Sequence, residues 1–334
     1  MTRPPRLAML TLQTLDHFTP DLLVRLPAVS GWEVGKFMVT GPASLAAALA
    51  WTDDPARDAI WFEFCWPPFP AMIAAADFAG RRLIVRVHRI EATEMPYVAN
   101  TQWEKVSDVI VVSPDMEQRV QAAAPELRFV TRLHLICNGV DIGRFCQSPA
   151  WDPFRIGWCG LMTLRKNPTL ALQILAHLRA TDSRYHLRLC GMGGERLALE
   201  TFHHLARRLD LLDAIHSDGR VAPADMPAWH AANGVLLHTS LHEGLSYAVL
   251  EAAASGCDLA VFDHPGAAGC WPEAVLFGSV DEAAALIGSA QAGRWRAHVS
   301  ARFSLDRQIQ QVSAMLNRGA DTPEAAAATE TYVR

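Results

Sequence analysis

Short apolar runs alternate with helix-like segments along nearly the whole chain, and this alternation constrains the fold more than any other feature. Residues 109–112 and 259–262 are apolar throughout, whereas residues 44–51 and 168–178 are rich in Ala and Leu at helical spacing. Strands that are apolar on both faces and separated by helices indicate parallel sheets with helices on both sides. The sequence therefore predicts an α/β fold.

The alternation runs through two series, which a turn-rich segment around Asn138-Gly139 separates. The predicted strands cover residues 7–12, 59–63, 83–87, 109–112 and 133–137, and then 156–158, 187–189, 214–217, 234–238 and 259–262. The predicted helices cover residues 44–51, 71–78 and 116–124, and then 168–178, 196–209, 226–231, 246–254, 280–286 and 305–316. A chain of 334 residues is too long for one compact α/β unit and suits two.

We therefore predict two Rossmann-like domains that face a cleft. The first spans residues 1–146, the second spans residues 147–318, and a flexible tail, residues 319–334, follows them. In open α/β sheets ligands bind at the carboxyl ends of the strands, so the predicted site lies in the cleft.

One segment, HEGLSYAVLEAAASG at residues 242–256, predicts the chemistry of a ligand. Glu251 stands in an otherwise apolar helix, where a carboxylate is costly to bury unless a polar group meets it. Gly244 has no Cβ and lets the backbone approach a ligand closely. The helix that begins near Ser246 directs N–H groups and the positive end of its dipole at the same place. A phosphate fits there, and Glu243 and Glu251 can hold hydroxyl groups, which together describe a nucleotide sugar.

Bulk composition argues against several other classes of protein. The net charge of -5, without a basic excess, argues against a nucleic-acid partner. The seven cysteines show neither a C-x-x-C pair nor metal-like spacing, so we expect reduced thiols in a cytoplasmic protein. The basic start resembles a signal peptide, but polar residues interrupt its apolar run, which we interpret as a buried first strand. No apolar stretch is long enough to span a bilayer.

Three further patterns have plain structural interpretations. Arg294, Arg296 and Arg302 suit a solvated helix face, and the alternative is peripheral contact with anionic lipid at the inner face of the membrane. His238 and His242 have the spacing of two zinc ligands, but they straddle a strand end and lack a third ligand, so we predict no metal. The sequence GMGG at residues 191–194 is an incomplete dinucleotide fingerprint, and a sharp turn after a strand explains it equally well.

Four landmarks in order resemble those of a glycosyltransferase with the B fold, and specifically glycosyltransferase family 4 within group 1. SDVIVVSP at residues 107–114 resembles the family's D-x-[IV]-x-x-[VP]-S strand, and ICNGVDIGRF at residues 136–145 resembles its I-P-N-G-V-D linker. CGLMTLRKN at residues 159–167 resembles its G-R-L-x-x-x-K-G loop. The segment at residues 242–256 resembles its motif with two glutamates. The resemblance covers most of residues 80–265 and implies a retaining transferase that uses a nucleotide-diphosphate sugar.

The resemblance assigns roles to donor-binding residues of the second domain. Lys166 matches the lysine that binds the donor diphosphate, whereas Leu161 occupies the position of the family's arginine, for which the neighbouring Arg165 could substitute. Glu243 matches the carboxylate near the donor sugar, and Glu251 matches the one that holds the ribose hydroxyls. The backbone that meets the phosphates corresponds to Gly244, Leu245 and Ser246. The loop near the nucleotide base corresponds to Gly219, Arg220 and Val221.

In the first domain, the resemblance implies an active-site histidine at His88. Glu91 and Glu94 follow in the same loop, and we rank Glu91 first as a catalytic residue. The family's first loop usually holds a Gly-Gly pair, whereas residues 14–18 contain no glycine. This departure leaves the contacts of that loop and the identity of the acceptor open.

The hypothesis from the sequence is a retaining, metal-independent glycosyltransferase with no cofactor other than its donor substrate. Its acceptor is a glycan, a lipid-linked sugar or a protein, and bacterial surface polysaccharide is the expected product. Two alternatives stay open: a binding or scaffold protein on a degenerate fold, which Leu161 and the altered first loop suggest, and a sugar-nucleotide epimerase. The retained pair of glutamates favours the transferase over both.

Overall fold

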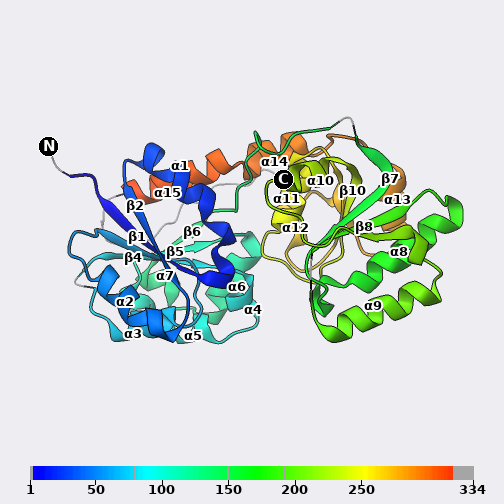
Figure 1. The fold of residues 1–334 in the computed structure, drawn as a ribbon. Helices are drawn as coiled ribbons and strands as arrows, with labels where there is room; N and C mark the ends of the chain where they lie inside the picture. The colour runs from blue at the N-terminus through cyan, green and yellow to red at the C-terminus, as the bar shows by residue number, and fades with distance from the viewer. Residues whose placement is uncertain (1–2, 79, 149, 192, 319–334) are drawn as a thin grey trace. The chain divides into compact units, whose positions relative to one another are not determined.

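The computed structural model describes residues 3–78, 80–148, 150–191 and 193–318 (Figure 1). The chain divides into two compact units. The first contains the chain up to Cys137 together with its last described part from Gln308, and the second is Asn138–Arg307. The predicted tail, residues 319–334, lies outside the described residues.

In the described part of the chain, each unit contains one six-stranded sheet, and all neighbouring strands in both sheets are parallel. The first sheet has the order β2-β1-β3-β4-β5-β6, with β1 (Arg6–Leu12), β2 (Glu33–Val39), β3 (Ala59–Phe62), β4 (Arg82–Val87), β5 (Asp108–Val111) and β6 (Arg132–Leu135). The second has the order β12-β11-β10-β7-β8-β9, with β7 (Asp152–Cys159), β8 (His186–Cys190), β9 (Ile215–Ser217), β10 (Asn233–His238), β11 (Asp258–Phe262) and β12 (Leu276–Phe277). The predicted α/β class with two Rossmann-like domains is confirmed.

Helices connect the strands in both units, as parallel pairing requires. In the first unit they are α1 (Pro20–Ser30), α2 (Pro42–Thr52), α3 (Phe69–Ala75), α4 (Arg89–Thr93), α5 (Tyr97–Asn100), α6 (Pro114–Ala123) and α7 (Leu127–Val130). In the second they are α8 (Pro168–Thr181), α9 (Arg196–Arg208), α10 (Met226–Ala231), α11 (Tyr247–Ala254), α12 (Ala267–Cys270), α13 (Val280–Gly288) and α14 (Arg296–Phe303), and α15 (Leu305–Asn317) follows. Short 3-10 turns are η1 (Gln13–Phe18), η2 (Trp103–Lys105), η3 (Leu164–Lys166), η4 (Leu212–Ala214) and η5 (Glu273–Val275).

Among the elements of the first unit that were not predicted, the two longest, α1 and β2, each lack the pattern on which the prediction rests. Helix α1 begins with Pro20 and contains Pro27, a residue that disfavours helix interiors. Strand β2 lies at the edge of its sheet, and its residues are mostly half-buried, so it shows no continuous apolar run. The central strands β3 and β5, in contrast, are buried along their whole length and carry the pattern that was predicted.

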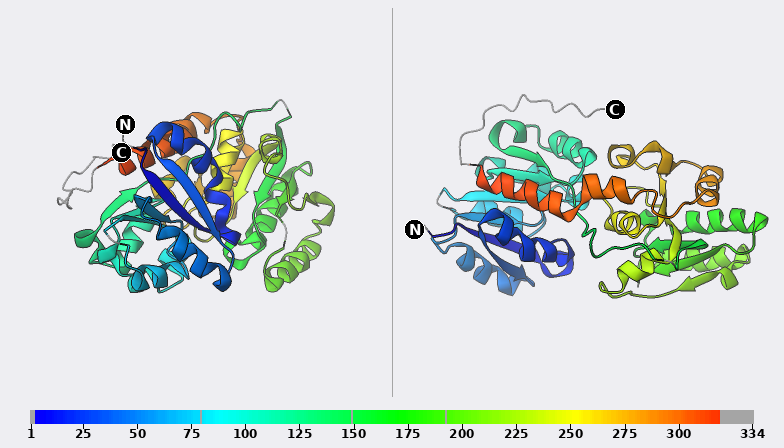
Figure 2. Two further views of the ribbon diagram at one scale, coloured as in Figure 1. Left: turned by 60° about the vertical axis from the view of Figure 1, so that its left-hand side comes forward. Right: turned by 90° about the horizontal axis from the view of Figure 1, so that it is seen from above.

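Helix α15 carries the end of the described chain back to the first unit, beside α1 and the start of β4 (Figures 1 and 2). The side-chain oxygen of Asn317 accepts a hydrogen bond from the Trp32 indole at 2.9 Å. The Arg82 guanidinium donates to the carbonyl of Leu316 at 2.8 Å. The first unit therefore includes a segment that the sequence analysis placed in the second domain.

The boundary after the first sheet also differs from the predicted one, because the second unit begins at Asn138 rather than at residue 147. The Val140 N–H donates to the Phe303 carbonyl at 2.9 Å, and the Leu305 N–H donates to the Val140 carbonyl at 2.9 Å. A Cβ on Gly139 would lie 2.6 Å from the Leu305 Cα, so this close approach needs glycine. The predicted turn at Asn138-Gly139 is thus packed against the chain that leads into α15.

Candidate functional site

The loop after β7 carries two basic side chains, and its backbone is bonded to the loop after β10. The Thr163 hydroxyl caps η3 by accepting the Lys166 N–H at 3.3 Å. The Arg165 carbonyl accepts the Leu241 N–H at 2.8 Å, and the Lys166 carbonyl accepts the Thr239 hydroxyl at 2.7 Å. These bonds bring Arg165 and Lys166 beside the segment that contains Glu243.

Both basic side chains converge on one oxygen of Glu243. The Lys166 Nζ lies 2.5 Å from Glu243 Oε1, and the Arg165 Nη1 lies 2.8 Å from the same atom. Burial alone would raise the pKa of Glu243, but the charge of Lys166, the nearby His238 and the charge of Arg165 hold it well below its usual range. Leu161 is 55% exposed and carries no charge, so Arg165 supplies the second cation of this loop.

Three histidines, His238, His242 and His264, lie near Glu243. The sequence analysis assigned none of these histidines to a ligand. The His238 Nε2 lies 3.7 Å from Glu243 Oε1, and burial lowers the pKa of His238 to about 4, so this ring is neutral near pH 7. The His264 ring is 6.3 Å from the His238 ring and 6.0 Å from the His242 ring. A narrow pocket joins this cluster to the start of α11, and its lining includes Glu243, Gly244, Leu245, Ser246 and His264.

Helix α11 places Glu251 one helical turn beyond its first residues. Ser246 is the residue before the helix, while Val249 and Leu250 are buried in the core. The Glu251 side chain is 19% exposed, and its Oε2 lies 3.5 Å from the Nε2 of the fully buried His230. In the described part of the chain neither ring nitrogen of His230 makes a hydrogen bond. Glu251 is therefore held near one imidazole and keeps part of its surface open.

The loop after β9 lies beside the carboxyl end of β8. The Gly219 carbonyl accepts the Gly191 N–H at 2.8 Å, the Val221 backbone bonds the Cys190 thiol, and Arg220 is exposed. Gly191 has a φ of 134°, and a Cβ there would lie 2.2 Å from the Gly160 carbonyl oxygen. Close packing of two loops therefore accounts for this glycine.

In the first unit, four polar side chains form a buried network at the end of β3 and β4. The Glu63 Oε2 accepts the Trp61 indole N–H at 2.8 Å. The Glu63 Oε1 accepts from the Arg86 Nη1 at 3.2 Å and faces the His88 Nε2 at 3.1 Å. Glu63 is fully buried and Arg86 is 1% exposed. The His88 ring also stacks on Phe64, with 4.3 Å between ring centroids.

Glu91, predicted as a catalytic residue, is bonded to backbone in the structure. Its Oε2 accepts the His88 N–H at 3.2 Å, and its Oε1 accepts the Cys65 N–H at 3.1 Å. Burial raises the pKa of Glu91 to about 7, and the backbone bonds lower it only in part. Both oxygens are thus used to cap α4 and to join it to the loop after β3. Glu91 therefore stabilises the local backbone. Glu94 is exposed and pairs with Arg89.

The first loop, which lacks the expected glycines, is a 3-10 turn. The Asp16 carboxylate accepts from the Lys36 Nζ at 2.7 Å and from the Thr19 hydroxyl at 2.9 Å. A pocket of about 530 Å³ opens beside this turn, at the carboxyl ends of β1 to β4. Its lining is mainly apolar and consists of Leu12, Gln13, Leu15, Val39, Thr40, Gly41, Leu45, Trp66, Pro67, Pro68 and Ile90.

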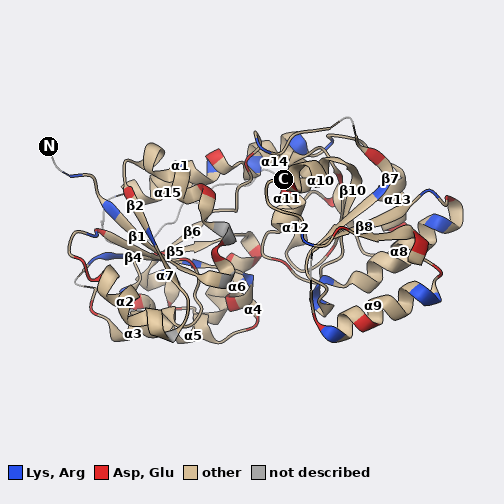
Figure 3. Cartoon of the chain, viewed as in Figure 1, with Lys and Arg blue, Asp and Glu red and all other residues tan. Residues whose placement is uncertain are grey.

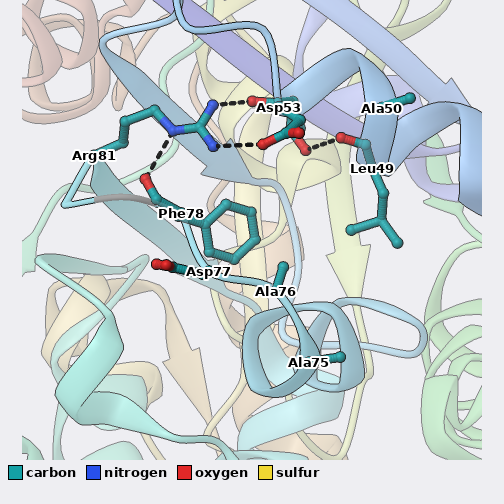
Figure 4. A pocket seen from close by; sticks show the side chains of 9 residues that line it. Leu49, Ala50, Asp53, Ala75, Ala76, Asp77, Phe78 and Arg81 are labelled. Carbon is teal, nitrogen blue, oxygen red and sulfur yellow. Dashed lines mark hydrogen bonds and ion pairs between the residues drawn. The ribbon is translucent and has the colours of Figure 1, made fainter.

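A second pocket of the first unit lies before β3 and β4, near their amino ends (Figure 4). Arg81 lies across it and donates to the Phe78 carbonyl at 2.8 Å, to the Asp53 carboxylate at 3.4 Å and to the Thr52 carbonyl. Because its guanidinium is used in these contacts and ligands of such sheets bind at the carboxyl ends, this pocket is a poor candidate site.

Charge is mixed over the described chain, and helix α9 carries residues of both signs (Figure 3).

The prediction that Arg296 belongs to a solvated helix face is wrong, because its guanidinium binds backbone carbonyls. Its Nη2 donates to the Ile142 carbonyl at 2.9 Å, and its Nη1 binds the carbonyls of Phe145 and Ala254. Among residues with described placement, no helix is long and apolar enough to cross a membrane, and no group of three His, Cys, Asp or Glu is placed to hold a metal ion.

The sequence analysis missed the network of Glu63 and Arg86. A signal was present, since each charged residue lies at or near the end of an otherwise apolar strand, where an unpaired charge would be costly. Opposite charges in two such strands indicate a buried pair. His230 and His264 gave no comparable signal, because their nearness to Glu251 and Glu243 depends on how distant segments pack.

Comparison with known proteins defines the fold. Residues 150–277 match the model of the family described as "Glycosyl transferases group 1". Anabaena HepE in complex with UDP and glucose is similar over 93% of this chain and 99% of its own, with 19% identity and a TM-score of 0.75. Sucrose-phosphate synthase from Thermosynechococcus elongatus is similar over 93% of this chain and 98% of its own, with 15% identity and a TM-score of 0.71. No curated protein matches the sequence.

The chain has the GT-B fold. The segment that matches the group 1 glycosyl transferase model, residues 150–277, contains Lys166, Glu243 and Glu251. A glycosyltransferase from Rickettsia africae has the same fold, with 12% identity and a TM-score of 0.68 over 95% of this chain and 100% of its own. His88 and Glu63 lie outside the matched segment. The expectation for His88 rests on the resemblance, and the place of Glu63 rests on the contacts described above.

Proposed function

We propose that the protein is a retaining glycosyltransferase, of family 4 within group 1, that uses a nucleotide-diphosphate sugar. The observation that carries this proposal is the convergence of Arg165 and Lys166 on Glu243, next to the start of α11. Two cations and a helix N-terminus favour a diphosphate, and the nearby carboxylates favour hydroxyl groups. Uridine is the base we propose, because Anabaena HepE binds UDP.

The donor's diphosphate competes with Glu243 for the two cations in this proposal. Lys166 and Arg165 then bind the phosphates, and the backbone of Gly244, Leu245 and Ser246 meets them from the other side. Glu251 accepts from the ribose hydroxyls, since its carboxylate is partly exposed and makes no ion pair shorter than 3.5 Å in the described chain. The loop at Gly219, Arg220 and Val221 lies against the base.

The reaction forms a bond between the sugar's anomeric carbon and an acceptor oxygen as the bond from that carbon to the diphosphate breaks. The electron pair of the broken bond leaves with the nucleoside diphosphate, which also takes the proton of the acceptor hydroxyl. Lys166 and Arg165 stabilise the negative charge that develops on the leaving diphosphate. These fixed charges make a metal ion unnecessary in our proposal. His88 binds a sugar hydroxyl near the reacting carbon, and Glu91 holds the turn that carries His88.

The pocket beside β1 to β4 supports a proposal for the acceptor. Leu15, Leu45 and Ile90 line it with few polar groups, and it adjoins the turn that carries His88. Such a surface suits an acceptor with an apolar group, and among the acceptor classes considered this favours a lipid-linked sugar. The protein would then act in the cytoplasm at the inner face of the membrane, in synthesis of a surface polysaccharide.

A donor screen followed by an activity assay tests the proposed function. Thermal unfolding is measured with UDP-, GDP-, ADP- and CMP-sugars, and a ligand at a hundred times its Kd adds about 2.7 kcal/mol to stability. We expect UDP-glucose or a related UDP-sugar to stabilise the protein and its UDP to be released in the presence of octyl glucoside. Absence of nucleotide binding would favour a scaffold protein, and conversion of the donor to an epimer without acceptor would favour an epimerase.

A variant of the apolar pocket tests the acceptor class. Leu45→Asp introduces a charge into the lining, and we expect at least a tenfold higher KM for octyl glucoside. The KM for the donor and the rate of donor hydrolysis should stay unchanged. Equal activity of the wild type towards glucose and octyl glucoside would contradict an apolar acceptor and leave the proposed donor chemistry intact.

A further inference from the structure

The buried network around Glu63 follows from the register of β3 and β4. Side chains alternate between the two faces of a strand, so Trp61 and Glu63 share a face, as do Arg86 and His88. The paired residues Phe62 and Val85 place Glu63 opposite Arg86. His88 follows two residues later, at the carboxyl end of β4. The strands therefore bring a glutamate, an arginine and a histidine to one edge of the first sheet.

The ionisation of Glu63 decides the direction of its hydrogen bonds. Burial would raise the pKa of Glu63, but the Arg86 charge and the bonds from His88 and Trp61 lower it below its usual value. An ionised carboxylate has no proton to give and only accepts hydrogen bonds. The three nitrogens that face Glu63 are therefore all donors, so the Nε2 of His88 carries a hydrogen.

We propose that Glu63 is a positioning residue that holds His88 as the Nε2–H tautomer. The described contacts of this histidine include Glu63 at Nε2, at 3.1 Å, Phe64 stacked on the ring face, and Glu91 at the His88 backbone N–H. In this tautomer Nδ1 has the lone pair of the neutral ring. A hydrogen bond between Nδ1 and a sugar hydroxyl is then one that His88 accepts.

Arg86 completes this arrangement by keeping Glu63 charged. Its Nη1 and the His88 Nε2 meet the same oxygen, Oε1, while the Trp61 indole holds Oε2. A protonated Glu63 could instead donate to Nε2, which would move the ring hydrogen to Nδ1 and reverse its polarity. The positioning role in catalysis rests on the proposed function, whereas the hydrogen on Nε2 follows from the network alone.

Nitrogen-15 NMR of the histidine-labelled full chain tests the tautomer directly. Two-bond correlations from ring carbon-bound hydrogens distinguish a protonated Nε2 from a protonated Nδ1, and the signal lost in His88→Gln identifies His88. We expect the Nε2–H pattern in the wild type at pH 7. An Nδ1–H pattern would overturn the proposal without the need for any Glu63 variant, and it would do so whether or not the protein binds a UDP-sugar.

Glu63→Gln tests the link between the network and the reaction. Glutamine keeps the size of the side chain but loses its charge, so we expect mixed tautomers at His88 and a kcat at least tenfold lower. The donor KM should change less than twofold, because the proposed contacts to the nucleotide and its diphosphate lie in the second unit. Glu94→Gln is the matched control, because this exposed carboxylate directly follows α4 and binds Arg89, and it should leave both the spectrum and kcat unchanged. An unchanged His88 spectrum in folded Glu63→Gln would contradict the positioning role.

Discussion

Both units place a glutamate, a histidine and cationic side chains at the carboxyl end of their sheet, but they support these groups differently. In the first unit, Glu63 and Arg86 are fixed by paired strands and are almost completely buried. In the second, Glu243 follows β10, and its partners Arg165 and Lys166 lie on a loop with 31% and 15% of their side chains exposed. The buried charges of Glu63 and Arg86, which paired strands hold in place, can keep one geometry. The partly exposed cations Arg165 and Lys166, which lie on a loop, can exchange Glu243 for a bound anion.

The largest expected difference between Glu63 and Glu243 is in how much their replacement lowers the free energy of unfolding. Glu63→Ala leaves Arg86 buried without its carboxylate, and breaking such a pair costs about 3–5 kcal/mol. Glu243→Ala removes a partner from cations that reach solvent, and we expect a loss of about 1 kcal/mol. Urea unfolding of each variant measures the two losses. Equal losses of unfolding free energy in the two variants would contradict the distinction between the fixed pair of Glu63 with Arg86 and the exchangeable contacts of Glu243.

Glu91 and Glu243 should contribute to the pH dependence of stability with opposite signs. Glu91 has its pKa raised from 4.5 to about 7, so the folded state binds more protons in this range. The resulting stability is present below pH 4.5 and is lost as pH rises through about 7, a change of about 3 kcal/mol. Glu243 has a lowered pKa, so its contribution is present above pH 4.5 and is lost only in more acidic solution.

Urea midpoints between pH 4 and 8 measure the Glu91 effect. Glu91→Gln cannot ionise, and the difference in unfolding free energy between wild type and variant should therefore change with pH. Glu94→Gln serves as an exposed control at the end of the same helix and should follow the wild type. A constant difference between wild type and Glu91→Gln from pH 4 to 8 would show that burial does not raise the pKa of Glu91.

Binding of UDP and of pyrophosphate should distinguish the proposed role of Glu251 from that of the phosphate-binding residues in the second unit. Glu251→Gln weakens the interaction with ribose hydroxyls, and we expect about tenfold weaker UDP binding, as for loss of one charged hydrogen bond. Pyrophosphate has no ribose, so its affinity should not change. Calorimetry with both ligands measures this contrast. Equal weakening of UDP and pyrophosphate would place Glu251 at the phosphates instead.

The smallest expected effect concerns Leu161. Leu161→Arg adds an exposed cation near Lys166, and a solvated charge contributes less than about 1 kcal/mol, or roughly a fivefold gain in UDP affinity. The gain should fall with added salt because exposed charges are screened. UDP titrations at low and high salt check this expectation. A loss of affinity in folded Leu161→Arg would indicate that Arg165 already fills the position.

The success of the sequence analysis differs between the two units for a physical reason. Three residues of the proposed donor site, Glu243, Gly244 and Glu251, lie close in sequence, so one motif places them together before and within α11. The Glu63 network depends on pairing between β3 and β4, which no local pattern reports. The unit boundary also depends on contacts between residues that are distant in sequence. One example is the hydrogen bond between Asn317 and Trp32, which helps to dock α15 on the first unit.

Calorimetric titration with UDP of the wild type, Lys166→Ala and Lys105→Ala tests the central claim most directly. Lys166 lies beside Glu243, whereas Lys105 is a lysine of the first unit that donates to the Ile73 and Ala74 carbonyls. We predict that Lys166→Ala weakens UDP binding by about 10- to 100-fold, the loss expected for a charged hydrogen bond to phosphate, and that Lys105→Ala binds UDP like the wild type. Wild-type affinity in folded Lys166→Ala would contradict the assignment of the donor diphosphate to this site.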